Sequence, residues 1–353
     1  MDMKKKLAMF LAGVMVVASL MGCGKAADST PKAVDNVATA EKPELELIVA
    51  HNQTSLENPY AFGVNKFKEK LEELSDGKVK VTVHHGTLGE NESELIEKLE
   101  MGAASMVVAS PGFMTSIGVP EIDMLSLLYV FDSFDHWEKS LDGDFGNSMK
   151  QIVTEKTSNA FRIMGYWTSS VRDYYGKKSI KTPADLKGMT LRTQTSGVVK
   201  EFWEAVGAIP TNVAWGELYQ ALSQGVVDSA ENDYTNFMLK EHHKTANGKF
   251  VSETHHDYTT RLLLMNGAFY DGLTDEQKGW IDEAATAATQ EERQVTYKMF
   301  EESKEKVIAD GATVVEFGDM DIEAFKAIAV PIQDKFAQAN NMTEQLEMIR
   351  AAK

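Results

Sequence analysis

Three histidine pairs and a single cysteine are the side chains that first suggest metal or nucleophilic chemistry. The pairs are His84-His85, His242-His243 and His255-His256, and the cysteine is Cys23. Adjacent residues point to opposite faces of a strand and do not face one another on a helix, so such a pair is poorly placed to chelate one ion. A lone cysteine excludes a disulfide within the chain and a cysteine-based metal cluster. We therefore predict no metal site.

The motifs that mark enzyme active sites are missing from this sequence. It has no glycine-rich phosphate loop, no His-Glu-x-x-His motif and no nucleophile elbow. Its 18 methionines are scattered along the chain, a pattern typical of core filling. We predict that the chain is not an enzyme and needs no cofactor.

The N-terminus has the pattern of a secretion signal. Lysines at positions 4–6 precede an apolar run that ends just before Cys23. This run is too short, and wrongly flanked, for a membrane-spanning helix. Residues 20–23, Leu-Met-Gly-Cys, resemble a lipobox, in which a peptidase cleaves before the cysteine and the thiol carries diacylglycerol. We expect a lipoprotein signal peptide over 1–22 and lipidation of Cys23; an ordinary cleaved signal is the alternative.

A polar tether and an acidic body follow the signal. Residues 23–43 contain almost no large apolar side chains, so they cannot help form a core and are expected to be a flexible linker. The remaining chain, roughly 310 residues, is enough for two lobes. The net charge of −17 argues against nucleic acid and a broad anionic membrane surface as partners. It does not exclude a small anionic ligand, because surface charge is screened within about 10 Å.

Strands and helices are predicted to alternate in the first part of the body. An apolar stripe of helical spacing runs from Tyr60 to Leu74, and a second helix is marked by Leu95 and Leu99. Strands are predicted before, between and after these helices, at 45–50, 79–83 and 105–109. Such alternation indicates a parallel sheet covered by helices.

Later segments carry clear helix-capping signals. Residues 182–188 read as one capped helical turn, followed by a strand at 189–192. A capping box at 274–277 opens a helical run that reaches about Val307. With no Gly or Pro over 280–309, this helix would be about 45 Å long at 1.5 Å per residue, long enough to span two lobes.

Five ordered segments resemble the solute-binding proteins of tripartite ATP-independent periplasmic (TRAP) transporters, the DctP family. They are 166–172 (YWTSSVR), 182–192 (TPADLKGMTLR), 206–211 (VGAIPT), 215–222 (WGELYQAL) and 225–232 (GVVDSAEN). Weaker matches extend the resemblance over nearly the whole body, at Leu88-Gly89, Pro120-Glu121 and 273–278.

The resemblance implies a two-lobed α/β fold like that of periplasmic binding proteins. Each lobe would contain a mixed, mostly parallel sheet flanked by helices, with one long helix crossing both lobes. We expect lobe I at 44–169 with about 258–297, and lobe II at 170–257 with about 298–353. The implied function is extracytoplasmic capture of a small organic acid. We expect the protein to be a monomer, anchored through the lipid on Cys23. A TRAP membrane permease would then take up the ligand, driven by an ion gradient.

Two arginines match the family's carboxylate-binding residues. Arg192 matches the arginine that grips the ligand carboxylate, and Arg172 matches a second one near the same group. A guanidinium offers paired planar donors and keeps its charge, which suits a carboxylate. Arg192 also ends a predicted strand, the place where ligands bind in open α/β sheets. A surface arginine in a salt bridge is the alternative for each.

Other polar and aromatic residues are carried over from the same motifs. Asn232 matches an asparagine that bonds the carboxylate, and Trp215 stands where the family places an aromatic ring against the ligand. A core tryptophan is the alternative for Trp215. Tyr175 and Tyr234 lie near the arginine and asparagine motifs, and we expect both to contact the ligand.

The first lobe is expected to contribute Asn52, His51 and Glu92. Asn52 follows the first strand, where the family presents a polar ligand contact, and His51 is adjacent. Glu92 matches an acid that accepts hydrogen bonds from ligand hydroxyls.

The sequence also narrows the ligand class. Members that bind sialic acid place charged residues after the third strand, whereas 103–120 contains none. Residues 172–175 and 231–234 look more like members that take up hexuronates and related sugar acids. We expect a sugar acid such as a hexuronate or aldonate. A C4-dicarboxylate, a 2-oxo acid, and ligand sensing for a membrane receptor remain open.

Overall fold

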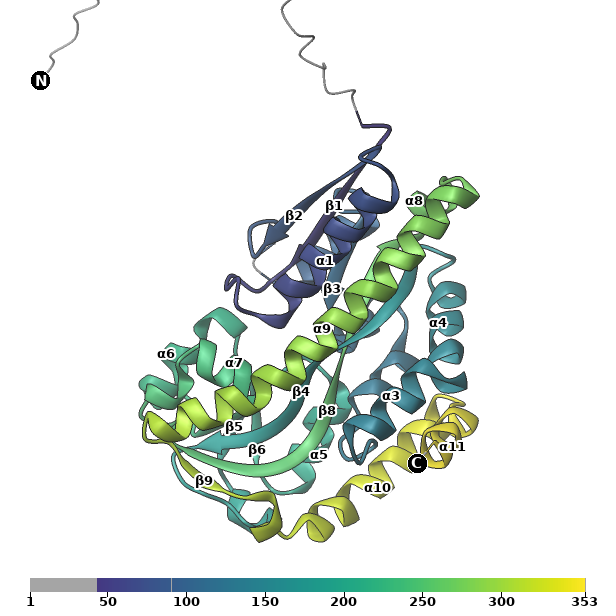
Figure 1. Ribbon diagram of the computed structural model, residues 1–353. Helices are drawn as coiled ribbons and strands as arrows, with labels where there is room; N and C mark the ends of the chain where they lie inside the picture. Colours follow the sequence, from purple (N-terminus) through teal and green to yellow (C-terminus); the bar gives the residue numbers. More distant parts are fainter. Residues whose placement is uncertain (1–42, 90, 353) are drawn as a thin grey trace, which may run out of the picture. The chain divides into compact units, whose positions relative to one another are not determined.

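One mixed sheet of nine strands organises the residues that the computed structural model describes, 43–89 and 91–352 (Figure 1). The strand order is β2-β1-β3-β8-β4-β7-β5-β6, with β9 paired to β8. The strands are β1 Leu45–His51, β2 Val79–His85, β3 Met106–Ala109, β4 Phe161–Gly176, β5 Thr190–Thr193, β6 Ile209–Asn212, β7 Ser229–Asn232, β8 Phe250–Asn266 and β9 Thr313–Val315.

Helices connect the strands and cover the sheet (Figure 1). The α-helices are α1 Pro59–Leu74, α2 Glu92–Glu100, α3 Phe134–Asp142, α4 Asp144–Lys156, α5 Gly197–Ala205, α6 Leu218–Ser223, α7 Tyr234–Leu239, α8 Gly267–Asp271, α9 Asp275–Ala309, α10 Ile322–Ala339 and α11 Thr343–Ala351. Short 3₁₀ helices are η1 Pro111–Ile117, η2 Pro120–Ser126, η3 Pro183–Leu186, η4 Trp215–Glu217, η5 His242–Lys244 and η6 Phe317–Asp319.

The elements with strong local signals are confirmed. β1 pairs in parallel with both β2 and β3, as the alternation of strands and helices predicted. The turn at η3 has its capping box, formed by Thr182 and Asp185, and α9 begins with the box formed by Thr274 and Gln277. α9 is 35 residues long and contacts both α1 and α7. It therefore touches both regions of the fold, one built on β1, β2 and β3 and the other on β5, β6 and β7.

Two long antiparallel strands, β4 and β8, were not predicted, and they join the two regions. They are 16 and 17 residues long and run through the centre of the sheet. Their pairing is irregular, with register shifts between Thr168 and Val171 and between Arg172 and Tyr174. Ser170 and His255 adopt left-handed backbone conformations here, with φ of 76° and 43°. The predicted lobe boundaries, after 169 and after 257, fall within these continuous strands.

Strand alternation divides the core between the two faces of the sheet. In β3, Met106 and Val108 pack with α1 and α9, whereas Val107 and Ala109 pack with the larger cluster on the other face. Leu263 and Leu264 of β8 divide in the same way. β3 and residues 262–265 of β8 are therefore continuous apolar runs, because both of their faces are covered.

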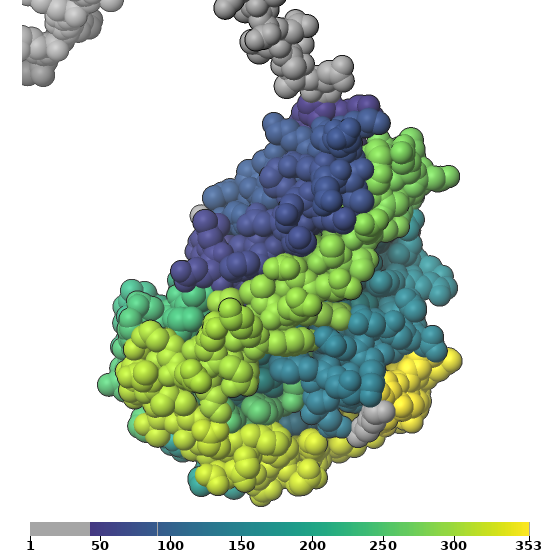
Figure 2. Space-filling view, in the orientation of Figure 1, coloured from purple at the N-terminus to yellow at the C-terminus, as the bar shows by residue number. Residues whose placement is uncertain are grey.

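The contact between α1 and α9 is unusually close at one glycine. Figure 2 shows α9, in green, lying along one face of the molecule beside the purple α1. A Cβ added to Gly63 of α1 would stand 2.6 Å from the Trp167 ring and 2.9 Å from the Glu292 Cβ. Only a glycine lets the two helices approach this closely without a shift of Trp167.

Glu292 is a buried carboxyl of α9 that holds the irregular part of β4. It accepts hydrogen bonds from the Thr168 backbone N at 3.1 Å and from Thr296 Oγ1 at 3.1 Å. Burial raises the pKa of Glu292 to about 8, although the two hydrogen bonds and nearby arginines oppose the shift. The long helix is thereby tied to the point where β4 loses its regular register.

The signal peptide, Cys23 and most of the linker lie outside the described residues. Within 43–89 and 91–352, no helix is long and apolar enough to cross a membrane.

Candidate ligand-binding site

A cavity of about 620 Å³ lies at the carboxyl ends of the parallel strands. Residues that follow or end β1, β3, β5, β6 and β7 line it, together with side chains from the middle of β4 and β8. The volume is in the range of pockets that hold small metabolites. This position is where ligands bind in open α/β sheets, because loops from neighbouring strands converge there.

Arg192 is a buried cation that faces this cavity without a counter-ion. It lies on β5, and its side chain is 7% exposed. Its Nε donates to the Val213 carbonyl at 3.1 Å, and its guanidinium lies 5.7 Å from the centre of the Trp215 ring. No carboxylate of the described residues lies within 4 Å of it. Burial lowers the pKa of Arg192, against the opposing pull of Glu231. Only its Nε is hydrogen-bonded to the described residues, so the two Nη groups are left to receive an anion.

Arg172 lines the same cavity but is already paired. Its Nε donates to the Glu231 carboxylate, and one Nη donates to the Glu231 carbonyl at 2.6 Å. The other Nη donates to Asn232 Oδ1 at 2.8 Å. Burial would lower the pKa of Arg172, but Glu231 outweighs it and raises the pKa. Burial would likewise raise the pKa of Glu231, yet Arg172 brings it down to about 2.

Asn232 presents a hydrogen-bond donor to the cavity, and Trp215 contributes to the lining of the same wall. Asn232 Oδ1 accepts from Arg172 and also from the Asp233 backbone N at 3.0 Å, so its Nδ2 group is left to donate. Trp215 is half-buried in the lining, but its Nε1 is itself buried and has no hydrogen-bond partner among the described residues. Its ring lies beside the Arg192 guanidinium.

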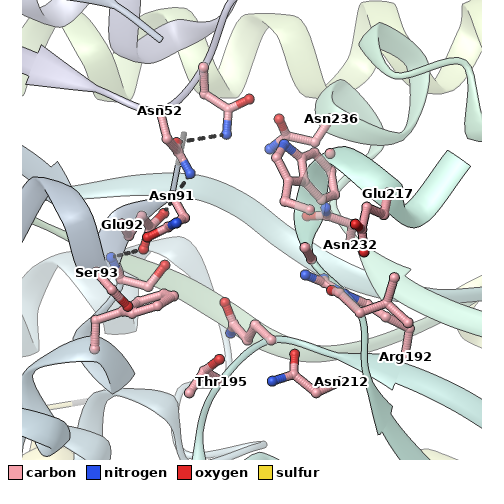
Figure 3. Close-up of a pocket in the computed structure, with 18 of the residues that line it drawn as sticks. Asn52, Asn91, Glu92, Ser93, Arg192, Thr195, Asn212, Glu217, Asn232 and Asn236 are labelled. Atoms are coloured by element: carbon pink, nitrogen blue, oxygen red, sulfur yellow. Dashed lines mark hydrogen bonds between the residues drawn. The ribbon is translucent and has the colours of Figure 1, made fainter. Parts of the chain in front are cut away.

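The opposite wall carries Asn52 and Glu92. Asn52 Nδ2 donates to Glu92 Oε1 at 3.2 Å, and the other Glu92 oxygen accepts from the Ser110 backbone N at 2.7 Å. Glu92 is the first residue of α2, whose N-cap is Asn91. Figure 3 shows Asn52, Glu92 and their neighbours facing Arg192 and Asn232 across open space. The two walls come from different regions of the chain.

Three residues predicted to touch the ligand do not line the cavity. His51 points into the core, where its Nε2 is 2.8 Å from His85 Nδ1. Tyr175 bonds through its hydroxyl to His242 Nδ1 at 2.8 Å, and Tyr234 donates to Glu253 Oε1 at 3.0 Å. Each of the three is next to or near a cavity residue in sequence, but in this structure strand or helix geometry turns its side chain away from the cavity. Ligand contact by these residues stays a prediction.

Sequence reasoning missed several lining residues. They are mostly polar and include Tyr60, Gln194, Asn212, Glu217, Asn236 and Arg261. One of them has a sequence signal: Arg261 is a charged residue next to the apolar run 262–265, within a strand buried on both faces. The others lie in loops, in the short elements β6 and η4, or in the first turn of a helix, where no periodicity marks a direction.

Contacts between the two walls close the cavity at its margins. Asn58, the N-cap of α1, donates through Nδ2 to Asn236 Oδ1 of α7 at 3.2 Å. At another margin, Asp123 of η2 accepts a hydrogen bond from the Gly197 backbone N of α5 at 3.1 Å. The walls therefore meet in this conformation.

Among the described residues, no group of three or more His, Cys, Asp or Glu side chains is placed to hold a metal ion.

A polar, arginine-lined cavity between two regions joined by β4, β8 and α9 is the architecture of a solute-binding protein. Residues 49–340 match the family described as bacterial extracellular solute-binding protein, family 7 (DctP), and the chain belongs to this family. It is thus an extracytoplasmic solute-binding protein of the TRAP type and not an enzyme.

Solved relatives share the fold and hold sugar acids. A TRAP solute-binding protein from Sulfitobacter sp. NAS-14.1, with bound β-D-galacturonate, is 28% identical with a TM-score of 0.80, covering 86% of this chain and 99% of its own. One from Roseobacter denitrificans, with bound β-D-glucuronate, is 27% identical with a TM-score of 0.81, covering 87% and 100%. The C4-dicarboxylate-binding protein DctP of Rhodobacter capsulatus is 25% identical over 299 residues, or 84% of this chain and 87% of its own.

Proposed function

We propose that this protein captures a sugar acid, a hexuronate or an aldonate, outside the cytoplasm and delivers it to a TRAP permease. The observation that carries the proposal is Arg192, a buried guanidinium that lines the cavity with no carboxylate of the described residues within 4 Å. An isolated buried charge is unfavourable, and a ligand carboxylate would remove that cost.

The geometry assigns different tasks to the two arginines. Arg192 has both Nη groups available for a bidentate pair with a carboxylate. Arg172 uses its Nε and both Nη groups on Glu231 and Asn232, so it acts mainly by holding Asn232 in place. The Nδ2 group of Asn232 would then donate to the carboxylate bound at Arg192. The Trp215 ring, which lies beside the Arg192 guanidinium, would cover the same group.

The rest of the cavity suits a ligand rich in hydroxyls. Its lining offers both donors and acceptors, namely Asn52, Gln53, Glu92, Gln194, Asn212 and Asn236. A hydroxyl can donate and accept at once, so such a mixed lining satisfies a sugar better than a short diacid. The galacturonate and glucuronate complexes of the two solved relatives support this ligand class. The Rhodobacter relative makes a C4-dicarboxylate the second candidate.

We propose that binding closes the two lobes about a hinge in β4 and β8. The lobes would be 44–169 with about 258–297, and 170–257 with about 298–353. Register shifts in the paired strands supply a place to bend. The Asn58–Asn236 bond would form on closure. Expelling water from the cleft lowers the local dielectric and strengthens the ion pair at Arg192.

We further propose that the protein is a lipid-anchored monomer. Residues 1–22 would be removed, Cys23 would carry the lipid, and 23–43 would tether the body near the membrane and its permease. Palmitate labelling of wild type and of a Cys23→Ala variant tests the anchor: label in both, or in neither, would contradict it.

A thermal-shift screen of the chain without residues 1–22 tests the ligand class. The panel contains D-glucuronate, D-galacturonate, D-erythronate, succinate and pyruvate, with D-glucose as the neutral control. A ligand at 100 times its Kd stabilises the folded state by about 2.7 kcal/mol. A rise in Tm with a sugar acid and none with glucose is the expected result. A shift with succinate or pyruvate alone would replace the sugar-acid assignment, and no shift at all would refute it.

A further inference from the structure

Arg261 is a second buried arginine of the cavity that lacks an ion pair. It lies in the middle of β8, is 7% exposed and lines the cavity. Its single hydrogen bond to the described residues runs from Nη1 to the adjacent Thr260 carbonyl at 3.0 Å. No carboxylate of those residues lies within 4 Å of its guanidinium. A guanidinium has five N–H donors, so most of its capacity is unused.

The strand order places Arg261 away from Arg192. β8 and β5 are separated in the sheet by β4 and β7. Three strand spacings of about 4.8 Å put the two backbones roughly 14 Å apart across the sheet. The two arginines therefore enter the cavity from different strands, and we place them at different parts of the ligand.

The surroundings of Arg261 differ from those of Arg192. Burial would lower the pKa of Arg261, but Tyr60, Glu92 and Asp257 raise it above its ordinary value. Glu92 is held in place by Asn52 and by the Ser110 backbone. This part of the cavity therefore pairs a fixed cationic donor with a fixed anionic acceptor.

A donor beside an acceptor fits hydroxyl groups better than a carboxylate. Each hydroxyl can accept from the guanidinium and donate to the Glu92 oxygens. A second carboxylate would also meet the Glu92 charge, and opposed like charges in a closed cavity are strongly unfavourable.

We propose that Arg261 contacts the ligand directly, donating to hydroxyls far from the carboxylate, while Glu92 beside it excludes a second acidic group. This inference rests on the proposed function and deepens it: the ligand is a hydroxylated monoacid, and aldarates and C4-dicarboxylates are rejected. A purely structural Arg261 would affect every ligand alike, and the test is built on that difference.

The test measures Kd by calorimetry for wild type, Arg261→Met, Arg261→Lys and Glu92→Gln, with Arg350→Met as a control at a half-exposed arginine of α11. The ligands are D-glucuronate, D-galacturonate, monodeoxy analogues of the tighter binder, and D-glucarate. Arg261→Met should weaken hexuronate binding about 10- to 100-fold, the loss of one charge-assisted hydrogen bond. For at least one deoxy analogue the same substitution should cost less than about threefold, because the hydroxyl is already missing.

Glu92→Gln should lower the ratio of the Kd for glucarate to the Kd for glucuronate about tenfold or more. The reason is that the Glu92 carboxylate, which repels the second acidic group of glucarate, is gone. An equal loss for every ligand with Arg261→Met, or no loss, would overturn the proposal. If Arg261→Met does not fold, Arg261→Lys must show the same ligand-dependent difference, and an equal loss there refutes it. Failure of wild type to bind any hexuronate would refute the proposed function itself, and this inference with it.

Discussion

Replacing Arg192 by methionine should abolish most ligand affinity while leaving the ligand-free protein as stable as before or more stable. The methionine keeps much of the arginine stem and removes the guanidinium. Its two Nη groups would each give the ligand a charge-assisted hydrogen bond, worth about 1.5–3 kcal/mol. Removing one partner of a buried charge pair costs about 2–5 kcal/mol. At 1.4 kcal/mol per factor of ten, affinity should fall about 30-fold to about 4,000-fold.

The same substitution should also change the stability of the ligand-free protein. Burial lowers the pKa of Arg192, so the folded state holds this proton less tightly than the unfolded state. The charge therefore costs stability at every pH below the folded-state pKa, which covers the whole working range. Arg192→Met should raise the ligand-free Tm by about 2 °C, about 1 kcal/mol for a chain of this size.

Calorimetry and thermal unfolding together test this reasoning. Arg192→Lys keeps the charge without the planar fork and should fall between wild type and Arg192→Met in affinity. Arg350→Met, a half-exposed control, should change neither quantity. Near-normal binding by Arg192→Met would refute the assignment, and a large drop in its ligand-free Tm would show that Arg192 holds the fold instead.

Three further predictions concern the packing of α1 on α9, the pH dependence of stability and the contact between Asn58 and Asn236. Gly63→Ala should destabilise by about 1–3 kcal/mol, because its Cβ overlaps the packed α1–α9 contact, whereas Gly279→Ala in open space on α9 should stabilise by up to about 1 kcal/mol. Equal urea midpoints for the two would contradict this packing. Wild type should lose stability as pH rises from 4.5 to about 8, because the folded state binds the Glu292 proton more tightly than the unfolded state; Glu292→Gln should flatten that loss in urea titrations at several pH values. An unchanged slope would show that another group is responsible. Asn58→Asp keeps the α1 N-cap acceptor but removes the donor to Asn236, so ligand affinity should fall about 3- to 10-fold with little change in ligand-free Tm. Unaltered affinity would show that this bond does not contribute to closure.

Elements encoded by local patterns could be predicted from the sequence. The apolar stripe of α1, the β-branched run of β1 and the capping box of α9 each depend on residues a few positions apart. The long strands β4 and β8 could not be found in this way. They are buried on both faces and broken by register shifts, so no two-residue alternation persists along them.

The candidate site shows the same difference between what local sequence patterns predict and what long-range pairing decides. The sequence by itself determined which motifs carry the candidate binding groups, because Arg172, Arg192 and Asn232 stand in ordered segments that resemble one family. Only the tertiary structure decided which side chains share the cavity. It brings Arg261 of β8 to the lining and turns His51 into the core, because side-chain direction depends on the pairing of strands far apart in the chain.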